Sequence, residues 1–242
     1  MEMKFNDTYF VLDTETGGLN PQEHSLMEIA GVIVKGDKII YEYSTLVESD
    51  NGKYNCGEYA RKLHGITDEM CNTQGKRAHE IIGDLLEIKR KFFGDSPMTI
   101  VAHNTAFDIS FVKEMFNKEF GSLRNKPIYE KLKSIDYDAL FARNAIDTAT
   151  MALILRSFNK LPFDRCSLDN ILKFYNLEVP QEKRHTALGD ARQTALAFIA
   201  MREDLKAGEK ANPKTRLISE NLTFNNSAGD SDENLENGEK IR

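Results

Sequence analysis

Several features that define other protein classes are missing from this sequence. It contains no tryptophan and only three cysteines, Cys56, Cys71 and Cys166, which lack the pairing of a disulfide framework and the CxxC spacing of a zinc site. Its longest apolar runs, such as 29–34, are far shorter than the roughly 20 residues of a membrane helix. The charged N-terminus has no signal-peptide pattern. We therefore expect a soluble, cytoplasmic chain with free thiols and no membrane contact.

A surplus of positive charge is also missing. The formal net charge is -6 at pH 7, which argues mildly against a protein that coats nucleic acid through a broad basic surface. It does not exclude a nuclease, because divalent cations held by clustered carboxylates invert the local field and let a phosphodiester approach. The net negative charge is therefore weak evidence about function.

Hydrophobic patterning predicts an α/β fold. Short apolar runs bounded by turn signals indicate strands, and apolar residues at three- and four-residue steps indicate helices. The predicted strands are 9–12, 29–34, 39–47 and 99–102, and the predicted helices are 77–93, 107–116, 148–158, 168–175 and 189–205. Asp147 and Ser167 suit the N-caps of two helices. Strands come first and then alternate with helices, a pattern typical of a mixed sheet flanked by helices, with 29–47 as an antiparallel hairpin beside the first strand.

Composition divides the chain into one domain and a tail. Residues 1–205 carry almost all of the patterned apolar sequence, whereas Gly, Asn, Ser, Glu and Lys dominate 206–242. Such a segment buries too little apolar surface to order itself, so we expect a polar, disordered tail. The charged segment 121–138 supports no clear assignment and is interpreted as an insertion.

Two carboxylates lie at the end of the first predicted strand. Asp13 and Glu15 are two residues apart, so their side chains point to the same side of a strand. Two carboxylates this close repel each other unless a divalent cation lies between them. The competing interpretation is a solvated turn before Gly17 and Gly18.

Three further residues, two aspartates and a histidine, lie at or just before the predicted starts of helices. Asp108 lies near the start of a predicted helix after the strand 99–102, and Asp190 lies at the start of the last helix of the domain, five residues after His185. Taken singly, each aspartate is also explained as a helix cap, and an isolated surface histidine is usually inert.

Together, these motifs resemble the DEDDh family of 3′→5′ exonucleases, which includes the proofreading epsilon subunit of bacterial DNA polymerase III. The resemblance spans about Tyr9 to Ala200. It is carried in order by Asp-x-Glu at 13–15, His-Asn-x-x-Phe-Asp at 103–108 and His-x-x-x-x-Asp at 185–190. Minor matches are Met-Glu-Ile-Ala at 27–30, Leu-His-Gly-Ile-Thr at 63–67, Asp-Thr at 147–148 and Ser-Leu-Asp at 167–169. An RNase H-like fold is implied.

The resemblance implies a two-metal reaction with Mg²⁺ or Mn²⁺. One cation is expected on Asp13, Glu15 and Asp190 and the second on Asp13 and Asp108. One ion activates water, and both stabilise the attacking and leaving oxygens of an in-line displacement. His185 matches the histidine that takes the proton from the attacking water, a task suited to an imidazole near neutral pH. The expected product is a nucleoside 5′-monophosphate.

The resemblance also implies residues that hold the terminal nucleotides. They are Thr14, Thr16, Leu19, His64, Asn104 and Phe107. Turn formation or core packing is the alternative for each, and for Phe107 core packing is as good an explanation as a base contact. Tyr59 departs from the pattern, because epsilon carries a glutamate at the matching place.

Three alternatives remain open at this point. The chain could be a nucleic-acid-binding module without activity, although all five expected catalytic residues are present. The substrate could be an RNA 3′ end rather than single-stranded or frayed DNA, since no motif reports contact with a 2′-hydroxyl. The tail could also tether the domain to a polymerase or a sliding clamp, because Leu222-Thr223-Phe224 loosely resembles a short hydrophobic anchor.

Overall fold

The computed structural model describes residues 7–123, 135–177 and 185–206. Within these residues, five strands form one sheet in the order β3-β2-β1-β4-β5. The strands are β1 (Thr8–Thr16), β2 (Leu26–Lys35), β3 (Lys38–Leu46), β4 (Ile100–Ala102) and β5 (Ile146–Asp147). β1, β2 and β3 pair antiparallel, while β4 pairs parallel to both β1 and β5. The predicted hairpin and mixed sheet are confirmed.

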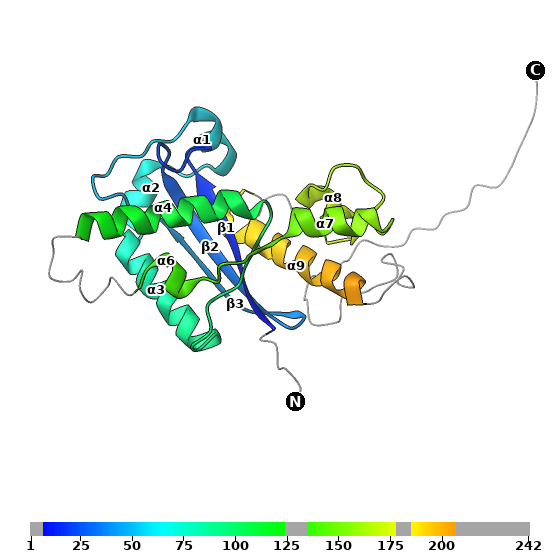
Figure 1. Ribbon diagram of the computed structural model, residues 1–242. Coiled ribbons are helices and arrows are strands. Elements are labelled where there is room, and N and C mark those ends of the chain that lie inside the picture. The colour runs from blue at the N-terminus through cyan, green and yellow to red at the C-terminus, as the bar shows by residue number, and fades with distance from the viewer. Residues whose placement is uncertain (1–6, 124–134, 178–184, 207–242) are drawn as a thin grey trace, which may run out of the picture.

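Helices cover both faces of the sheet (Figure 1). They are α1 (Glu58–His64), α2 (Asp68–Gln74), α3 (Ala78–Phe92), α4 (Thr105–Leu123), α6 (Tyr137–Leu140), α7 (Thr148–Ser157), α8 (Leu168–Phe174) and α9 (Ala187–Lys206). The side chains of Asp147 and Ser167 accept hydrogen bonds from first-turn N–H groups of α7 and α8, as predicted. No helix among the described residues is long and apolar enough to span a bilayer.

The alternation of β1 creates two separate cores. Phe10 and Leu12 point to the face covered by α3 and α4, whereas Val11 points to the face covered by α9. α9 brings Ala187, Ala191 and Ala195 against the sheet, at four-residue spacing. Because these side chains are small, the helix backbone lies close to β1 and β2. Asp13 and Glu15 continue the Val11 side of the strand and therefore face the start of α9.

The structure corrects several boundaries. α4 runs over 105–123 rather than 107–116, and α9 begins at Ala187 rather than Gly189. β5, α1, α2 and α6 were not predicted, because each is short and carries little periodic apolar sequence. The segment 121–138 includes the end of α4 and the start of α6, which is capped by Asp136. Its residues 124–134, like the tail 207–242, lie outside the described residues.

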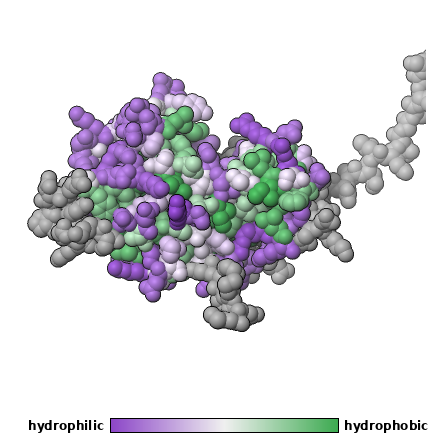
Figure 2. All heavy atoms as spheres, in the orientation of Figure 1, coloured by the Kyte–Doolittle hydropathy of each residue, from purple (hydrophilic) through white to green (hydrophobic). Residues whose placement is uncertain are grey.

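The α7–α8 lobe presents apolar surface. Figure 2 shows apolar side chains gathered on its near face, and Leu153, Ile154 and Phe158 of this lobe are exposed. The underside of the lobe packs on the second half of α9 through Ala152, Leu155 and Ala197. This lobe thereby supports α9 from the side opposite the sheet.

Candidate active site

Three carboxylates converge where β1 meets the start of α9. Asp13 and Glu15 come from β1 and Asp190 from the first turn of α9, and one oxygen of each lies within 4.8 Å of the others. Glu15 is buried, while Asp13 and Asp190 are partly exposed. The group is therefore open on one side and held by backbone on the other, as a metal site with exchangeable ligands requires.

The first turn of α9 is shaped by Thr186 rather than by Asp190. The Thr186 hydroxyl accepts a hydrogen bond from the Gly189 N–H at 3.1 Å, and the Thr186 carbonyl accepts one from the Asp190 N–H at 3.0 Å. Asp190 is the fourth residue of the helix. Thr186 rather than Asp190 therefore takes the cap position of α9, and the Asp190 side chain lies among the converging carboxylates.

Asp108 approaches from the other face of the sheet. It is the fourth residue of α4, 4% exposed, and its Oδ1 accepts a hydrogen bond from the Thr14 hydroxyl at 2.8 Å. The N–H of Thr105, the first residue of this helix, is accepted by Asp147. Because Thr14 lies between Asp13 and Glu15, its bond to Asp108 ties α4 to the carboxylate-bearing end of β1. The charge of Asp108 acts on Asp13, although Asp108 lies outside the three-carboxylate group.

Burial and mutual repulsion make these carboxyl groups hard to ionise. Burial, followed by the charges of Asp190, Glu28 and Asp108, raises the pKa of Glu15 to about 8. Burial raises the pKa of Asp108 to about 7, against the opposing effect of the Thr14 hydrogen bond. Burial and the charges of Asp108 and Asp190 hold the pKa of Asp13 well above its usual range. A hard divalent cation removes this penalty, because it balances several negative charges with oxygen ligands.

These shifts predict the pH dependence of stability. The folded, metal-free protein holds protons that the unfolded chain, with carboxyl pKa values of about 4, has released. Its stability is therefore expected to fall as pH rises from about 4 towards about 8. Added Mg²⁺ should raise the melting temperature, and by more at pH 8 than at pH 5. Thermal unfolding in EDTA and in Mg²⁺ checks this, and a gain that is equal at both pH values would contradict it.

His185 lies two residues before α9 and is exposed. Its backbone is left-handed, with φ 62°, a conformation that is uncommon outside glycine and that concentrates at functional sites. The turn places His185 on the chain segment that leads directly into Asp190. The sequence prediction of a histidine on the loop before this helix is confirmed.

Comparison with known proteins identifies the family. The sequence model described as Exonuclease matches residues 10–198, which include all five predicted catalytic residues. The chain belongs to this exonuclease family. The predicted family, fold class and enzyme class are thereby confirmed.

Curated relatives of this exonuclease-family chain are replication proteins. A PolC-type DNA polymerase III of Thermotoga maritima is 33% identical over 205 residues, which cover 82% of this chain and 12% of that protein. The DNA polymerase III subunit epsilon of Rickettsia typhi is 32% identical over 194 residues, covering 79% of this chain and 72% of that protein. The chain thus spans about one eighth of the polymerase relatives it matches.

Solved exonucleases share the fold. Exonuclease X in complex with 5′ overhanging duplex DNA has a TM-score of 0.54 and 24% identity, covering 81% of this chain and 92% of that chain. E. coli exonuclease I in complex with a dT13 oligonucleotide has a TM-score of 0.61 and 18% identity, covering 83% and 41%. At these identities the likeness establishes the architecture of the exonuclease domain.

The predicted nucleotide-binding residues differ in exposure. Leu19 is 85% exposed, and Asn104 is exposed with a left-handed φ of 67°. Phe107 is half-buried, and its ring lies 5.1 Å from that of Phe111. The Thr16 hydroxyl donates to the Gly18 carbonyl at 2.8 Å, and the Thr14 hydroxyl is taken by Asp108. The side chains of both threonines are therefore engaged within the protein, and their backbone groups also interact with Asp108 and His64.

The surroundings of His64 favour its neutral form. Its Nδ1 accepts a hydrogen bond from the Ile66 N–H at 2.9 Å, which places the proton on Nε2. Burial and the nearby Arg61 charge lower the pKa of His64. The surrounding loops pack closely because Gly17 leaves room: a Cβ there would lie 2.1 Å from the Asn55 carbonyl oxygen. His64 thus lies beside the Thr16 turn as a neutral donor.

Two residues near the carboxylates were not among the predicted site residues. Glu28 lies directly opposite Glu15 in the β1–β2 ladder and is 9% exposed. A lone acid in the otherwise apolar run of β2 is the signal that could have revealed it. Asp147 caps α7 and also accepts a hydrogen bond from the Thr105 N–H at 3.0 Å. It therefore fixes the start of the helix that carries Asp108.

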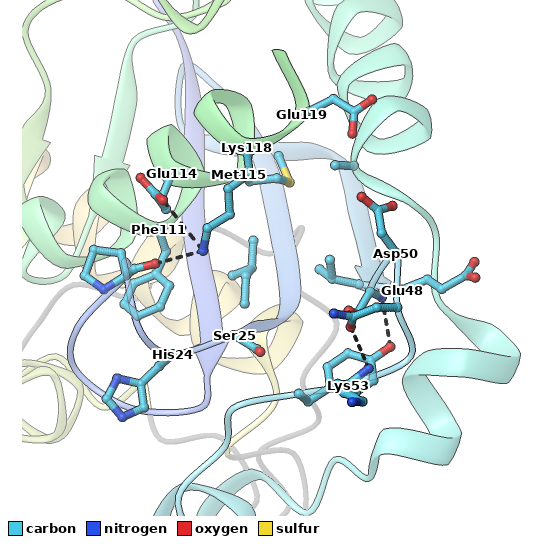
Figure 3. Close-up of a pocket in the computed structure, with 17 residues that line it drawn as sticks. His24, Ser25, Glu48, Asp50, Lys53, Phe111, Glu114, Met115, Lys118 and Glu119 are labelled. Carbon is cyan, nitrogen blue, oxygen red and sulfur yellow. Dashed lines mark hydrogen bonds and ion pairs between the residues drawn. The ribbon is translucent and has the colours of Figure 1, made fainter. Parts of the chain in front are cut away.

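A cavity of about 350 Å³ lies further along α4. Its walls are α4, the loop after β1 and the segment after β3. Figure 3 shows Lys118 pointing to Glu114 of the same helix, and the Lys118 ammonium also donates to the Pro21 carbonyl at 3.3 Å. None of the predicted carboxylates lines it. Phe111, the partner of Phe107, does. The cavity therefore adjoins the candidate active site without being part of its carboxylate group.

Proposed function

We propose that this chain is a metal-dependent 3′→5′ exonuclease that removes nucleoside 5′-monophosphates from the 3′ end of single-stranded or frayed DNA. The observation that carries the proposal is the convergence of Asp13, Glu15 and Asp190 within 4.8 Å, with Asp108 acting on Asp13 from the opposite face. A structural role alone does not account for it, because burial and repulsion make the cluster unfavourable without a cation.

The donor set fits two divalent cations, Mg²⁺ or Mn²⁺. Asp13, Glu15 and Asp190 would hold one ion, and Asp13 and Asp108 the other, since Asp13 lies between the two groups. All are hard oxygen donors, which these cations prefer. When bound, the ions supply an activated water at neutral pH and neutralise charge on the attacking and leaving oxygens. The Thr14 hydroxyl holds the Asp108 carboxylate in place.

The protein's own residues supply the proton transfer and the grip on the strand. His185 accepts the proton of the attacking water as the water oxygen bonds to phosphorus. The bond to the 3′ oxygen of the preceding nucleotide breaks, and that oxygen takes a proton from solvent. Exposed Leu19 and half-buried Phe107 flank the terminal base, Asn104 contacts the strand, and the backbone of Thr14 and Thr16, with His64, lines the terminal sugar and phosphate.

Digestion of matched oligonucleotides tests the proposal. The full chain is incubated with 5′-labelled single-stranded DNA and RNA of the same sequence, in Mg²⁺, Mn²⁺ or EDTA. A metal-dependent ladder that shortens from the 3′ end, faster on DNA, is expected. A faster ladder on RNA would assign the exoribonuclease alternative, and intact strands in both metals would leave the inactive binding module.

Relatives named as DNA polymerase III or its epsilon subunit support a polymerase as a partner. The Leu222-Thr223-Phe224 triplet supports a sliding clamp as the alternative, and either partner would be reached through the tail 206–242. A chain truncated after Lys206, where α9 ends, should keep exonuclease activity on free oligonucleotides. It should lose co-elution with the partner in gel filtration, whereas unchanged co-elution would assign the contact to the folded domain.

A further inference from the structure

Glu28 lies close to the three converging carboxylates, but its own carboxylate is not one of them. It occupies β2 directly across from Glu15, and cross-strand partners point to the same face of a sheet. Among the described residues, however, the converging group consists of Asp13, Glu15 and Asp190 alone. The buried carboxylate of Glu28 adds to the repulsion among these acids, because its charge acts on both Asp13 and Glu15. Its presence therefore calls for a compensating interaction.

The compensating interaction is a hydrogen bond to the start of α9. Glu28 Oε2 accepts the Ala187 N–H at 3.0 Å, a buried contact between residues 159 positions apart. Ala187 is the first residue of α9, and its N–H belongs to the group of helix N–H donors that no helical carbonyl reaches. A negative charge at this end of a helix is also favoured by the helix dipole. The Thr186 hydroxyl accepts the Gly189 N–H instead. Glu28 and Thr186 thus each accept one of the N–H groups of the first turn.

The position of this bond links it to the reaction. His185 lies two residues before Ala187 and Asp190 three residues after it. The bond therefore joins β2, at the position opposite Glu15, to the short segment that carries both His185 and Asp190. Two ion pairs also join the sheet to α9, Glu42–Arg192 from β3 and Asp7–Arg202 from the residue before β1. Glu28 differs from them because it reaches the first residue of the helix from the strand position opposite Glu15.

We propose that Glu28 is a positioning residue that holds the first turn of α9, and with it Asp190 and His185, in register with the carboxylates of β1. This inference rests on the proposed function. Glu28 contacts neither metal nor substrate in this role. Its effect is carried by the oxygen that receives the Ala187 N–H, so glutamine should replace it and alanine should not.

The experiment compares Glu28→Ala, Glu28→Gln and Glu42→Ala in the full chain. Glu42→Ala is the matched control, because Glu42 also ties the sheet to α9, through hydrogen bonds to Arg192, but from β3. Three quantities are measured: amide hydrogen exchange of the peptide covering 186–190 without metal, the Kd for Mn²⁺ from calorimetric titration, and kcat and KM on a single-stranded oligonucleotide.

For Glu28→Ala we expect faster exchange in 186–190, a Kd for Mn²⁺ raised roughly tenfold and a kcat lowered about 10- to 100-fold, as for other groups that orient metal ligands. KM should change little. Glu28→Gln should recover most of kcat and of the Mn²⁺ affinity. Glu42→Ala should lower thermal stability while leaving exchange in 186–190 and kcat close to wild type.

Two results would overturn the positioning role. One is a Glu28→Ala protein with the wild-type Kd for Mn²⁺ and the wild-type kcat. The other is equal impairment of Glu28→Ala and Glu28→Gln, which would make charge rather than the hydrogen bond the active property. A wild-type chain that neither binds Mn²⁺ nor cleaves would remove the proposed function itself, whereas a fully active wild type with an equally active Glu28→Ala removes only the role of Glu28.

Discussion

Asp13→Asn is expected to lower kcat roughly 10³-fold, because the substitution removes the one carboxylate that would contact both cations. Loss of metal-ion stabilisation corresponds to several kcal/mol of the barrier, and each factor of ten in rate is about 1.4 kcal/mol. Single-turnover cleavage of a 5′-labelled oligonucleotide in Mg²⁺ measures the effect. A calorimetric titration with Mn²⁺ should show weakened binding in parallel.

The stability of this variant separates a lost ligand from a lost fold. Burial and the charges of Asp108 and Asp190 disfavour ionised Asp13, so the neutral amide should leave the metal-free protein at least as stable as wild type at pH 8. Asp50→Asn is the matched control, since Asp50 is an exposed acid on the wall of the separate cavity. Wild-type cleavage by Asp13→Asn would refute the metal assignment.

His185→Ala is expected to lower kcat about 10²- to 10⁴-fold, the range typical of a lost general base. The imidazole would accept the proton of the attacking water, and without it only solvent can do so. The residual activity should therefore rise steeply with pH, as the hydroxide concentration rises. The pH–rate profile of kcat for wild type and variant in Mn²⁺ measures both effects.

The affinity of His185→Ala for Mn²⁺ should not fall together with its activity. His185 is not among the converging carboxylates, so the Kd for Mn²⁺ is expected to stay near wild type. His79→Ala serves as the control, because His79 lies on α3 with a half-exposed side chain paired to Glu119. If His185→Ala and His79→Ala have the same modest effect, another group takes the proton.

Local chemistry was enough to predict the longer strands and helices of the domain, but not the short elements β5, α1, α2 and α6. Alternation in β1, the turn between β2 and β3, and the caps at Asp147 and Ser167 are properties of neighbouring residues. The spacing of Asp13 and Glu15 likewise places both on one side of a strand whatever the rest of the chain does. The ends of α4 and α9 were missed, because tertiary contacts extend these helices past the periodic apolar residues that signal them.

The pairing of distant groups was decided only by the tertiary structure. In the sequence, Asp108 and Asp190 are each also explained as helix caps. Only the packing of α4 and α9 on opposite faces of β1 shows that Thr186 caps α9 and that Asp147 accepts the first N–H of α4. The bond between Glu28 and the Ala187 N–H is invisible in sequence, because it joins residues 159 positions apart. By itself the sequence was enough to predict which side chains would bind metal and move a proton. The close packing of small alanines on the sheet decided which of them meet, since only a helix backbone near β1 brings Asp190 to Asp13 and Glu15.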